Sequence, residues 1–270
     1  QRMIQMNKAI FFDIDGTLLD GSCGIYKMSA NTRIQIRRLQ QDGDFVFLAS
    51  GRPFAFLYED LLDFGFDGFI LMNGACIKLH DKAIYKQPLP KKYVDEVCRI
   101  CEKDNIEYIL LGEQHVYLDK RFHHLDDFFT SFRMPRAYFK DTFSLDEITG
   151  EIFKMEFSPQ DELQKAICKE FVTADIDYMQ DPRLAFHFEL YSKHISKATA
   201  ILKILDYLKI DRQNSYAFGD GKNDIEMLGA VCHSFAMGNA SAEIQALASH
   251  VVASVQEDGV AKGIAQYILA

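Results

Sequence analysis

The sequence predicts an α/β fold, a core with a parallel sheet that is interrupted by an inserted α+β unit. Two observations carry this prediction. Towards both ends of the 270-residue chain, short apolar runs alternate with amphipathic stretches, the pattern of parallel strands joined by helices. After Pro88-Leu89-Pro90 the pattern changes to paired strands mixed with helices, and the alternation resumes only near Ser196.

Composition narrows the class of protein and its partners. Thirty Lys and Arg against 39 Asp and Glu give a net charge of −9 with no block of basic residues, which argues against nucleic acid as a partner. No apolar run approaches the ~20 residues of a membrane span. The start, Gln1–Met6, lacks the apolar core of a signal peptide. We therefore expect a cytoplasmic protein without a membrane partner, as a monomer or weak homo-oligomer.

The first predicted strand ends in an acidic turn. Lys8–Phe12 is a short apolar run typical of a buried strand, and Asp13 and Asp15 follow it two residues apart. On an extended backbone such residues project to the same side. Two acids that close repel each other and are poorly hydrated beside an apolar strand, a conflict that a bound cation would resolve. Gly16 permits the tight turn. An acidic turn with no function is the alternative.

The rest of the first third alternates between helix and strand. The expected elements are a helix from Ser29 to about Gln41, a strand at Asp44–Ala49, a helix opened by Pro53 and running to about Phe64, a strand at Gly68–Met72, and a hairpin over about Ala75–Gln87. Because ligands bind at the carboxyl ends of parallel strands, the positions of Asp13, Ser50 and Asn73 at three such ends indicate a site.

The inserted unit is predicted from hairpins and helices. Its expected elements are a helix at 91–104, strands near Ile106–Leu111 and His115–Leu118, a helix near Arg121–Phe132, a strand at Ile152–Phe157, a helix from Pro159 to about Phe171, and strands near Ile176–Met179 and Leu184–Tyr191. His187 and Glu189 share one face of the last strand, where they could face a cleft or only water.

Two groupings in this unit resemble metal sites but are predicted not to be sites. Cys98 and Cys101 form a lone C-x-x-C inside a helix, so we expect reduced core cysteines. His123–Asp127 contains metal-ligand residue types, but on a helix these side chains radiate rather than converge. We expect a solvated helix face there.

The last third resumes the alternation. The expected elements are a helix capped by Ser196 with Ile201, Leu202, Leu205 and Leu208 on its apolar face, a strand at Ser215–Gly219, a helix through Met227-Leu228, a strand at Val231–Met237, a helix at Ser241–Ala248, a strand at His250–Ala253, and a C-terminal helix.

A second acidic turn follows the Ser215–Gly219 strand. Asp220 and Asp224 lie four apart at a strand–helix junction, so both can face the end of the strand. With Asp13 and Asp15 at the same sheet edge, four carboxylates would gather, and such hard oxygen ligands suit Mg²⁺. An acidic helix cap is the alternative.

Two further residues could neutralise or hold an anion at this edge. Lys197 stands in the first turn of a helix, where the helix dipole disfavours a cation. Near the carboxylates it would neutralise charge and grip a phosphoryl oxygen, whereas a solvated surface Lys is the alternative. Ser50 offers a hydroxyl and neighbouring backbone N–H groups to the same anion, although it could be a plain Ser-Gly turn.

Taken together and in order, four segments resemble the motifs of the haloacid dehalogenase-like phosphatases. They are D-x-D-G-T at Asp13–Thr17, the strand end Ser50–Arg52, Lys197, and G-D-x-x-N-D at Gly219–Asp224. The inserted unit resembles the cap of the Cof-type subgroup. Recurring segments of that subgroup are resembled by Asn73–Ala75, Met237–Ala240 and Asp258–Ala261. The chain departs from the family pattern at two positions, and both departures are minor. Ser50 stands where Thr is frequent and keeps the hydroxyl, and Ala198 stands where Gly is frequent.

The resemblance implies roles for these residues. Asp13 would be the nucleophile that becomes an aspartyl phosphate, and Asp15 the general acid and then the base. Mg²⁺ would be held by Asp13, the carbonyl of Asp15 and Asp220, with Asp224 in support. Ser50 and Lys197 would hold the phosphoryl group. The remaining expected substrate or phosphate contacts are Ile14, Gly51, Arg52, Asn73 and Asn223.

We therefore expect a Mg²⁺-dependent phosphatase of a small phosphorylated metabolite, with a sugar phosphate favoured. Its Rossmann-like core would comprise residues 1–82 and 186–270, and the α+β cap, which would set specificity, residues 83–185. A phosphomutase is the nearest alternative. A catalytically idle sugar-phosphate binder is another, although the intact pair Asp13 and Asp15 argues against it, because a binder needs no general acid.

Overall fold

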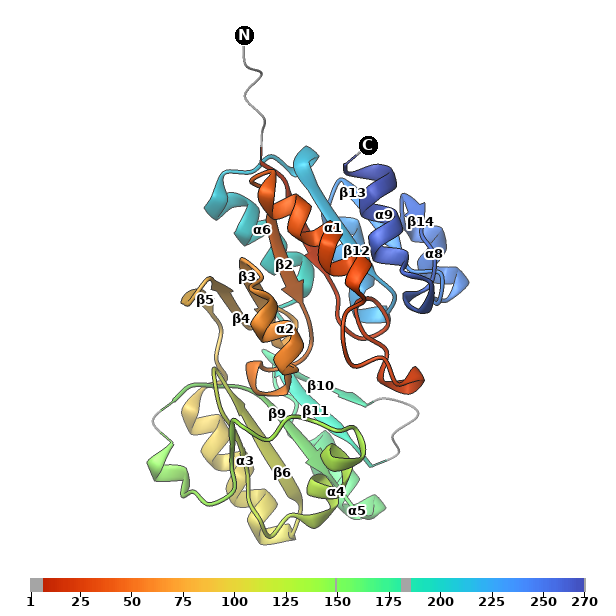
Figure 1. Ribbon diagram of the computed structural model, residues 1–270. Coiled ribbons are helices and arrows are strands. Elements are labelled where there is room, and N and C mark those ends of the chain that lie inside the picture. The colour runs from red at the N-terminus through yellow and green to blue at the C-terminus, as the bar shows by residue number, and fades with distance from the viewer. Residues whose placement is uncertain (1–6, 149, 181–185, 270) are drawn as a thin grey trace. The chain divides into compact units, whose positions relative to one another are not determined.

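The computed structural model describes residues 7–148, 150–180 and 186–269, and the chain divides into two compact units (Figure 1). The first unit takes in Gln1–Gly51, Tyr58–Tyr85 and Ser196–Ala270, and the second Arg52–Leu57 and Lys86–Ile195. The predicted fold class is confirmed, since the structure is a mixed α/β arrangement with a largely parallel sheet.

The first unit is built on an eight-stranded sheet in the order β14-β13-β12-β1-β2-β3-β4-β5. Its strands are β1 Ala9–Phe12, β2 Phe45–Ala49, β3 Gly68–Leu71, β4 Cys76–Leu79, β5 Lys82–Lys86, β12 Ser215–Gly219, β13 His233–Ala236 and β14 His250–Val251. The pairs from β14 to β3 are all parallel, and β4 runs antiparallel to β3.

Helices pack on this sheet through the alternating faces of its strands. They are α1 Ala30–Gln41, α2 Glu59–Phe64, α6 Lys197–Leu208, α7 Ile225–Ala230, α8 Ala242–Leu247 and α9 Gly259–Tyr267. Phe11 of β1 packs in one core cluster with buried side chains of α6, α7 and α8. Its neighbour Phe12 stacks on Phe218, against which α9 packs at Gly263. Helices α1 and α9 lie side by side (Figure 1).

The parallel pairing sets the place of the predicted site. Phe12, at the end of β1, is in register with Leu48 of β2 and Phe218 of β12. The carboxyl ends of these strands therefore meet at one edge of the sheet, where ligands bind in open α/β sheets. The acidic turn after β1, Ser50 after β2 and the acidic turn after β12 all begin at that edge.

The second unit is built on a six-stranded sheet in the order β10-β11-β9-β6-β7-β8. Its elements are α3 Lys91–Asp104, β6 Glu107–Gly112, β7 Val116–Leu118, α4 His123–Ser131, β8 Phe139–Lys140, β9 Ile152–Ser158, α5 Glu162–Lys169, β10 Ile176–Gln180 and β11 Phe188–Ser192. All its pairs are antiparallel except the short β7–β8 pair.

One face of this second sheet carries an apolar core. Cys98, Cys101 and Cys168 are buried there as free thiols, together with Met155 and Phe157 of β9. Burial raises the pKa of the Cys98 thiol to about 12, so this group is a thiol at neutral pH. The predicted reduced core cysteines are what the structure shows. The His123–Asp127 run is exposed on α4 apart from Leu125, as expected of a solvated helix face.

The other face carries a buried charged network. Lys154 and Glu156 alternate with the core residues of β9, and Lys154 Nζ lies 3.0 Å from Glu156 Oε1 and 2.6 Å from Glu189 Oε2. His187 Nε2 lies 3.1 Å from Glu156 Oε2, and the His187 ring stacks on Phe128. His187 is only 6% exposed, so the alternative that it faces water is wrong.

Three local predictions need correction. The helix predicted from Pro53 is instead a 3₁₀ turn at Phe54–Phe56 followed by α2, because Phe56 packs on Phe129 and Phe139 of the second unit. The strand predicted from Leu184 begins at Phe188, while residues 181–185 lie outside the described residues.

Leu202, which was predicted on the apolar face of its helix, is 52% exposed. The buried stripe of α6 contains Ile201, Ile204 and Leu205, and Leu202 lies outside it.

The two units also differ from the expected boundaries. β11, expected in the core, pairs with β9 and β10 and so belongs to the second sheet. The stretch Arg52–Leu57 also clusters with the second unit. None of the helices in the described part of the chain combines the length and apolarity needed to cross a membrane.

The charged network predicts how acid affects the second unit. Burial alone would raise the pKa of Glu156, but the charge of Lys154 and the hydrogen bond from His187 lower it to about 2, against an ordinary value of 4.5. Because the folded-state pKa is depressed, the stability that the Glu156 carboxylate contributes is fully present above about pH 4.5 and is lost as the pH falls towards 2.

We therefore expect Glu156→Gln to lower the free energy of unfolding at pH 7 by about 3 kcal/mol, because a buried partner loses its counter-charge. The difference from wild type should shrink below pH 4.5, as measured by urea unfolding followed with circular dichroism. Asp206→Asn, which removes an exposed ion pair to Lys209, is the control and should change little. A difference between Glu156→Gln and wild type that does not vary with pH would contradict this account.

Candidate active site

A buried ion-pair network joins the two acidic turns. Lys197 Nζ lies 2.5 Å from Asp13 Oδ1 and 2.7 Å from Asp224 Oδ1. Lys197 is 1% exposed, so the alternative of a solvated lysine is wrong. Ser196 caps α6 through its side-chain oxygen, which accepts a hydrogen bond from the Thr199 N–H. The cap starts the helix directly before Lys197, and so places the lysine at the sheet edge.

Asp224 organises the second acidic turn. Its Oδ2 accepts hydrogen bonds from the backbone N–H groups of Asp220 (3.0 Å) and Gly221 (2.9 Å), while its Oδ1 accepts one from Lys197. The side chain is fully buried. Both oxygens of Asp224 are thus engaged by the protein, which fits a supporting role better than that of a principal metal ligand.

Asp220 is held beside the first acidic turn. Thr17 Oγ1 donates a hydrogen bond to Asp220 Oδ1 at 3.3 Å, and Asn239 Nδ2 donates one to Oδ2 at 3.4 Å. Gly16 has a φ of 88°, and a Cβ at this position would lie 2.1 Å from Asp220 Oδ2. Only glycine therefore allows the close approach of the two turns.

Thr17 and Asn239 were not among the predicted site residues. The signals for them in the sequence are the threonine of D-x-D-G-T and the Met237–Ala240 segment. Asn239 Nδ2 also donates to the carbonyl of Gly16 at 2.8 Å, so it ties both turns together.

Burial and neighbouring negative charges raise the pKa values of Asp13 and Asp220. Oxygens of Asp13, Asp220 and Asp224 lie within 4.8 Å of one another. Burial and the Asp224 charge raise the pKa of Asp220 to about 7. The pKa of Asp13 is also raised, by burial and by Asp224, with Lys197 opposing the shift. Burial disfavours the charged form of Lys197, but Asp13 and Asp224 more than offset this and raise its pKa, so the lysine stays protonated.

This donor set fits a hard divalent cation. Three carboxylates converge while one lysine supplies a single positive charge, so negative charge remains uncompensated. Carboxylate oxygens are the ligands that Mg²⁺ prefers. The Asp15 side chain is exposed and is not one of the three, although its charge contributes to the raised pKa of Asp13.

The other predicted residues of the first unit lie at or near the same edge. Ser50 is 2% exposed at the end of β2, and its N–H donates to the carbonyl of Ile70. Ile14 is buried, and its carbonyl accepts hydrogen bonds from the N–H groups of Leu18 and Leu19. Asn223 is exposed on the turn between Asp220 and Asp224. Gly51 lies against the side chain of Asn73.

Arg52 differs from the rest because it clusters with the second unit. There its guanidinium donates to the carbonyl of Phe56 at 2.9 Å and lies 3.6 Å from Met134 Sδ. Its expected contact with phosphate stays a prediction.

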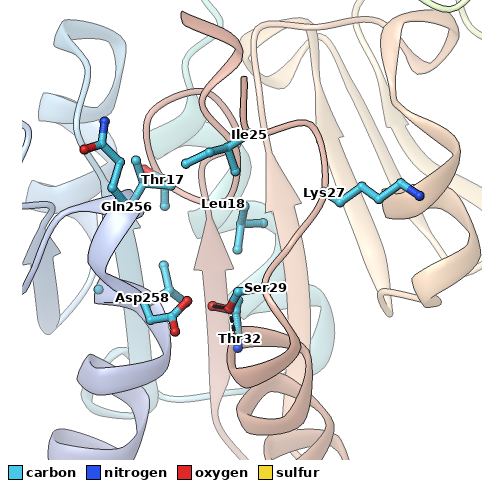
Figure 2. A pocket seen from close by; sticks show the side chains of 11 residues that line it. Thr17, Leu18, Ile25, Lys27, Ser29, Thr32, Gln256 and Asp258 are labelled. Carbon is cyan, nitrogen blue, oxygen red and sulfur yellow. Dashed lines mark hydrogen bonds between the residues drawn. The ribbon is translucent and has the colours of Figure 1, made fainter. Parts of the chain in front are cut away.

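A pocket of about 230 Å³ lies near this edge but is not its centre. It is lined by residues of the loop after β1 and of the starts of α1 and α9, and Figure 2 shows Ser29, Thr32 and Asp258 around its wall. Thr17, which lines the pocket, also donates a hydrogen bond to Asp220. The residues that line this pocket include neither Lys197 nor any of the three converging carboxylates. We therefore do not assign the pocket to the substrate.

Comparisons with known proteins identify the family of this chain. The family model of the haloacid dehalogenase-like hydrolases matches residues 10–264. The chain is 32% identical over 260 residues to "Putative phosphatase YkrA" of Bacillus subtilis, covering 96% of each chain. It is 28% identical over 268 residues to the 5-amino-6-(5-phospho-D-ribitylamino)uracil phosphatase YitU of the same organism, again covering 96% of each.

Among solved structures, the subclass IIB sugar phosphatase BT4131 matches with a TM-score of 0.77 and 25% identity, over 98% of this chain and 100% of the other. A protein of Geobacillus kaustophilus matches with a TM-score of 0.85 and 27% identity, over 98% and 100%. The predicted resemblance is thereby confirmed. The chain belongs to the haloacid dehalogenase-like hydrolases and is an enzyme of their phosphatase class.

Proposed function

We propose that this chain is a Mg²⁺-dependent phosphatase that hydrolyses a small sugar phosphate through an aspartyl phosphate on Asp13. The observation that carries the proposal is the buried Lys197 ammonium between Asp13 and Asp224, with the Asp220 carboxylate alongside. A site of this kind combines an activatable carboxylate with the positive charge that phosphoryl transfer needs. The named substrates of YitU and BT4131, a phosphorylated ribityl compound and sugar phosphates, support the substrate class.

In this mechanism Asp13 and Asp15 take different parts. An Asp13 carboxylate oxygen bonds to phosphorus while the bond from phosphorus to the leaving oxygen breaks, and Asp15 protonates that oxygen. Asp15 then takes a proton from water, which attacks the phosphorus, frees Asp13 and forms inorganic phosphate. The burial of Asp13 and the exposure of Asp15 suit a fixed nucleophile and an acid that exchanges protons with solvent.

The remaining residues position charge. Lys197 restrains the Asp13 carboxylate through Oδ1 and, with Ser50, would hold the phosphoryl oxygens. A Mg²⁺ ion held by Asp13, Asp220 and the carbonyl of Asp15, with Asp224 in support, would supply neutralisation of the phosphate dianion.

The second unit is proposed to select the substrate, while the first carries out the chemistry. A panel of phosphorylated metabolites assayed with Mg²⁺ tests the substrate class, and product analysis separates the alternatives. Release of inorganic phosphate supports the phosphatase, a phosphate moved within the sugar would indicate a phosphomutase, and binding without turnover would indicate an idle binder.

Removal of the metal should abolish turnover. EDTA should reduce hydrolysis to background and Mg²⁺ should restore it, whereas Ca²⁺ should serve poorly because it accepts looser, higher coordination. Mg²⁺ should also raise the Tm, since a ligand that binds the folded state stabilises it. Asp220→Asn should lose both responses, and Asp81→Asn, in the exposed turn between β4 and β5, should keep them. Full turnover in excess chelator would show that hydrolysis does not depend on a metal ion and would overturn the Mg²⁺ assignment.

The two acids of the first turn should fail in different ways. Asp13→Asn should form no phosphoenzyme, whereas Asp15→Asn should lose ~10²–10⁴-fold in turnover through the loss of acid–base catalysis. The leaving groups of aryl phosphates need little protonation. With these substrates Asp15→Asn should therefore show the smallest loss in the rate of phosphoenzyme formation, as measured by rapid quench. An Asp13→Asn protein with near wild-type turnover would overturn the covalent mechanism.

A further inference from the structure

The turn that follows β3 has a strained backbone. Met72, Asn73 and Gly74 have φ values of 50°, 56° and 107°, three successive residues in the left-handed half of conformational space. Asn tolerates this conformation and Gly adopts it freely, but for a residue such as Met the left-handed backbone costs ~1–2 kcal/mol of conformational free energy. Strain of this kind persists only where the surroundings enforce it, and it is frequent at functional sites.

One side of the turn holds the Ser50 loop. The Asn73 N–H donates to the carbonyl of Ser50 at 3.0 Å, and the Ser50 N–H donates to the carbonyl of Ile70 at 2.8 Å. Both backbone polar groups of Ser50 are therefore bound by β3 and its turn. The Asn73 carboxamide also covers Gly51, where a Cβ would lie 3.2 Å from Asn73 Oδ1.

The other side of the turn holds the start of α6. A Cβ on Gly74 would lie 2.6 Å from the carbonyl oxygen of Ser196 and 3.1 Å from Ala200 Cβ. Ser196 caps α6, and Lys197 is the next residue. The backbone of Gly74 is thus packed directly on the helix turn that carries Lys197.

Asn73 has a further unusual feature. Its Oδ1 is buried and is without a hydrogen-bond partner among the described residues. Leaving a buried acceptor unpaired costs ~1–3 kcal/mol. A phosphate dianion has no proton to donate, so Oδ1 cannot be the atom that binds phosphate, and the phosphate contact expected of Asn73 would have to come from its Nδ2 donor. Strain and an unpaired acceptor therefore coincide in one turn that contacts both the Ser50 loop and the Lys197 helix.

We propose that the Met72–Gly74 turn sets the relative position of Ser50 and Lys197, and that Asn73 is its positioning residue. This inference rests on the proposed function, in which Ser50 and Lys197 hold the phosphoryl group. The turn has the contacts needed for this role on both sides, through the backbone and the carboxamide of Asn73 on the Ser50 loop and through Gly74 on α6.

The test compares Asn73→Gly with a matched control. Asn73→Gly keeps a residue that adopts a positive φ but removes the carboxamide over Gly51. His80→Gly makes the same kind of change at a residue of the first unit that is exposed and whose φ is also positive, at 50°, in the turn between β4 and β5. Each variant is assayed for steady-state kinetics on an aryl phosphate and on a sugar phosphate, for inhibition by inorganic phosphate, and for Tm.

Asn73→Gly should weaken inhibition by inorganic phosphate and lower kcat/KM by about 10- to 100-fold, because small displacements of groups that hold the reacting atoms are costly. The fall in kcat/KM for Asn73→Gly should be the same with the aryl phosphate as with the sugar phosphate, whereas the fall for Asp15→Asn should depend on the leaving group. His80→Gly should match wild type in phosphate inhibition. Gly74→Ala should lower kcat/KM at least as much. If Gly74→Ala does not fold, the result for Asn73→Gly alone decides the test.

A fall in Tm for Asn73→Gly with unchanged phosphate inhibition and unchanged kcat/KM would show a merely structural turn and overturn the proposal. A wild-type protein that hydrolyses neither substrate would overturn the proposed function, and this inference with it. Active wild type with an unaffected Asn73→Gly would overturn the positioning role alone.

Discussion

The buried ammonium of Lys197 is the interaction on which the functional edge of the first unit depends. It joins Asp13, which follows β1, to Asp224, which lies beyond β12, although 184 residues separate Lys197 from Asp13 in the chain. Removing one partner of such a buried pair typically costs about 3–5 kcal/mol, because the remaining charge is left without compensation. The same contact that stabilises the edge therefore also fixes the distance between the proposed nucleophile and the second acidic turn.

Much of this arrangement could be predicted from the sequence, because it follows from local signals and from one property of parallel sheets. Ser29 and Ser196 mark helix starts through caps that involve only neighbouring residues. The carboxyl ends of parallel strands meet at one edge, so polar residues directly after apolar runs converge without any knowledge of tertiary contacts. Asp13, Ser50 and Asp220 were located by this reasoning, and the family was recognised from the same segments.

The predictions that failed depend on contacts between distant residues. The helix after Pro53 is interrupted because Phe56 packs on Phe129 and Phe139, more than seventy positions further along the chain. The role of Asn239 beside Asp220 depends on the pairing of β12 with β13, which no local pattern specifies. The strained turn after β3 could not be predicted from the sequence pattern either. Met72 has a positive φ, which a methionine rarely adopts, so its residue type gives no indication of this conformation.

A comparison of the two buried lysine networks shows why only one is assigned a metal. In the second unit, Lys154 lies between Glu156 and Glu189, and the hydrogen bond from His187 satisfies the second Glu156 oxygen. The ammonium already occupies the position that a cation would take between those carboxylates. At the edge of the first unit one lysine faces three converging aspartates, so two negative charges remain when all three are ionised. That deficit equals the charge of one divalent ion. Burial and then the charge of Asp224 raise the pKa of Asp220, and a bound divalent ion would oppose both effects by stabilising the carboxylate form.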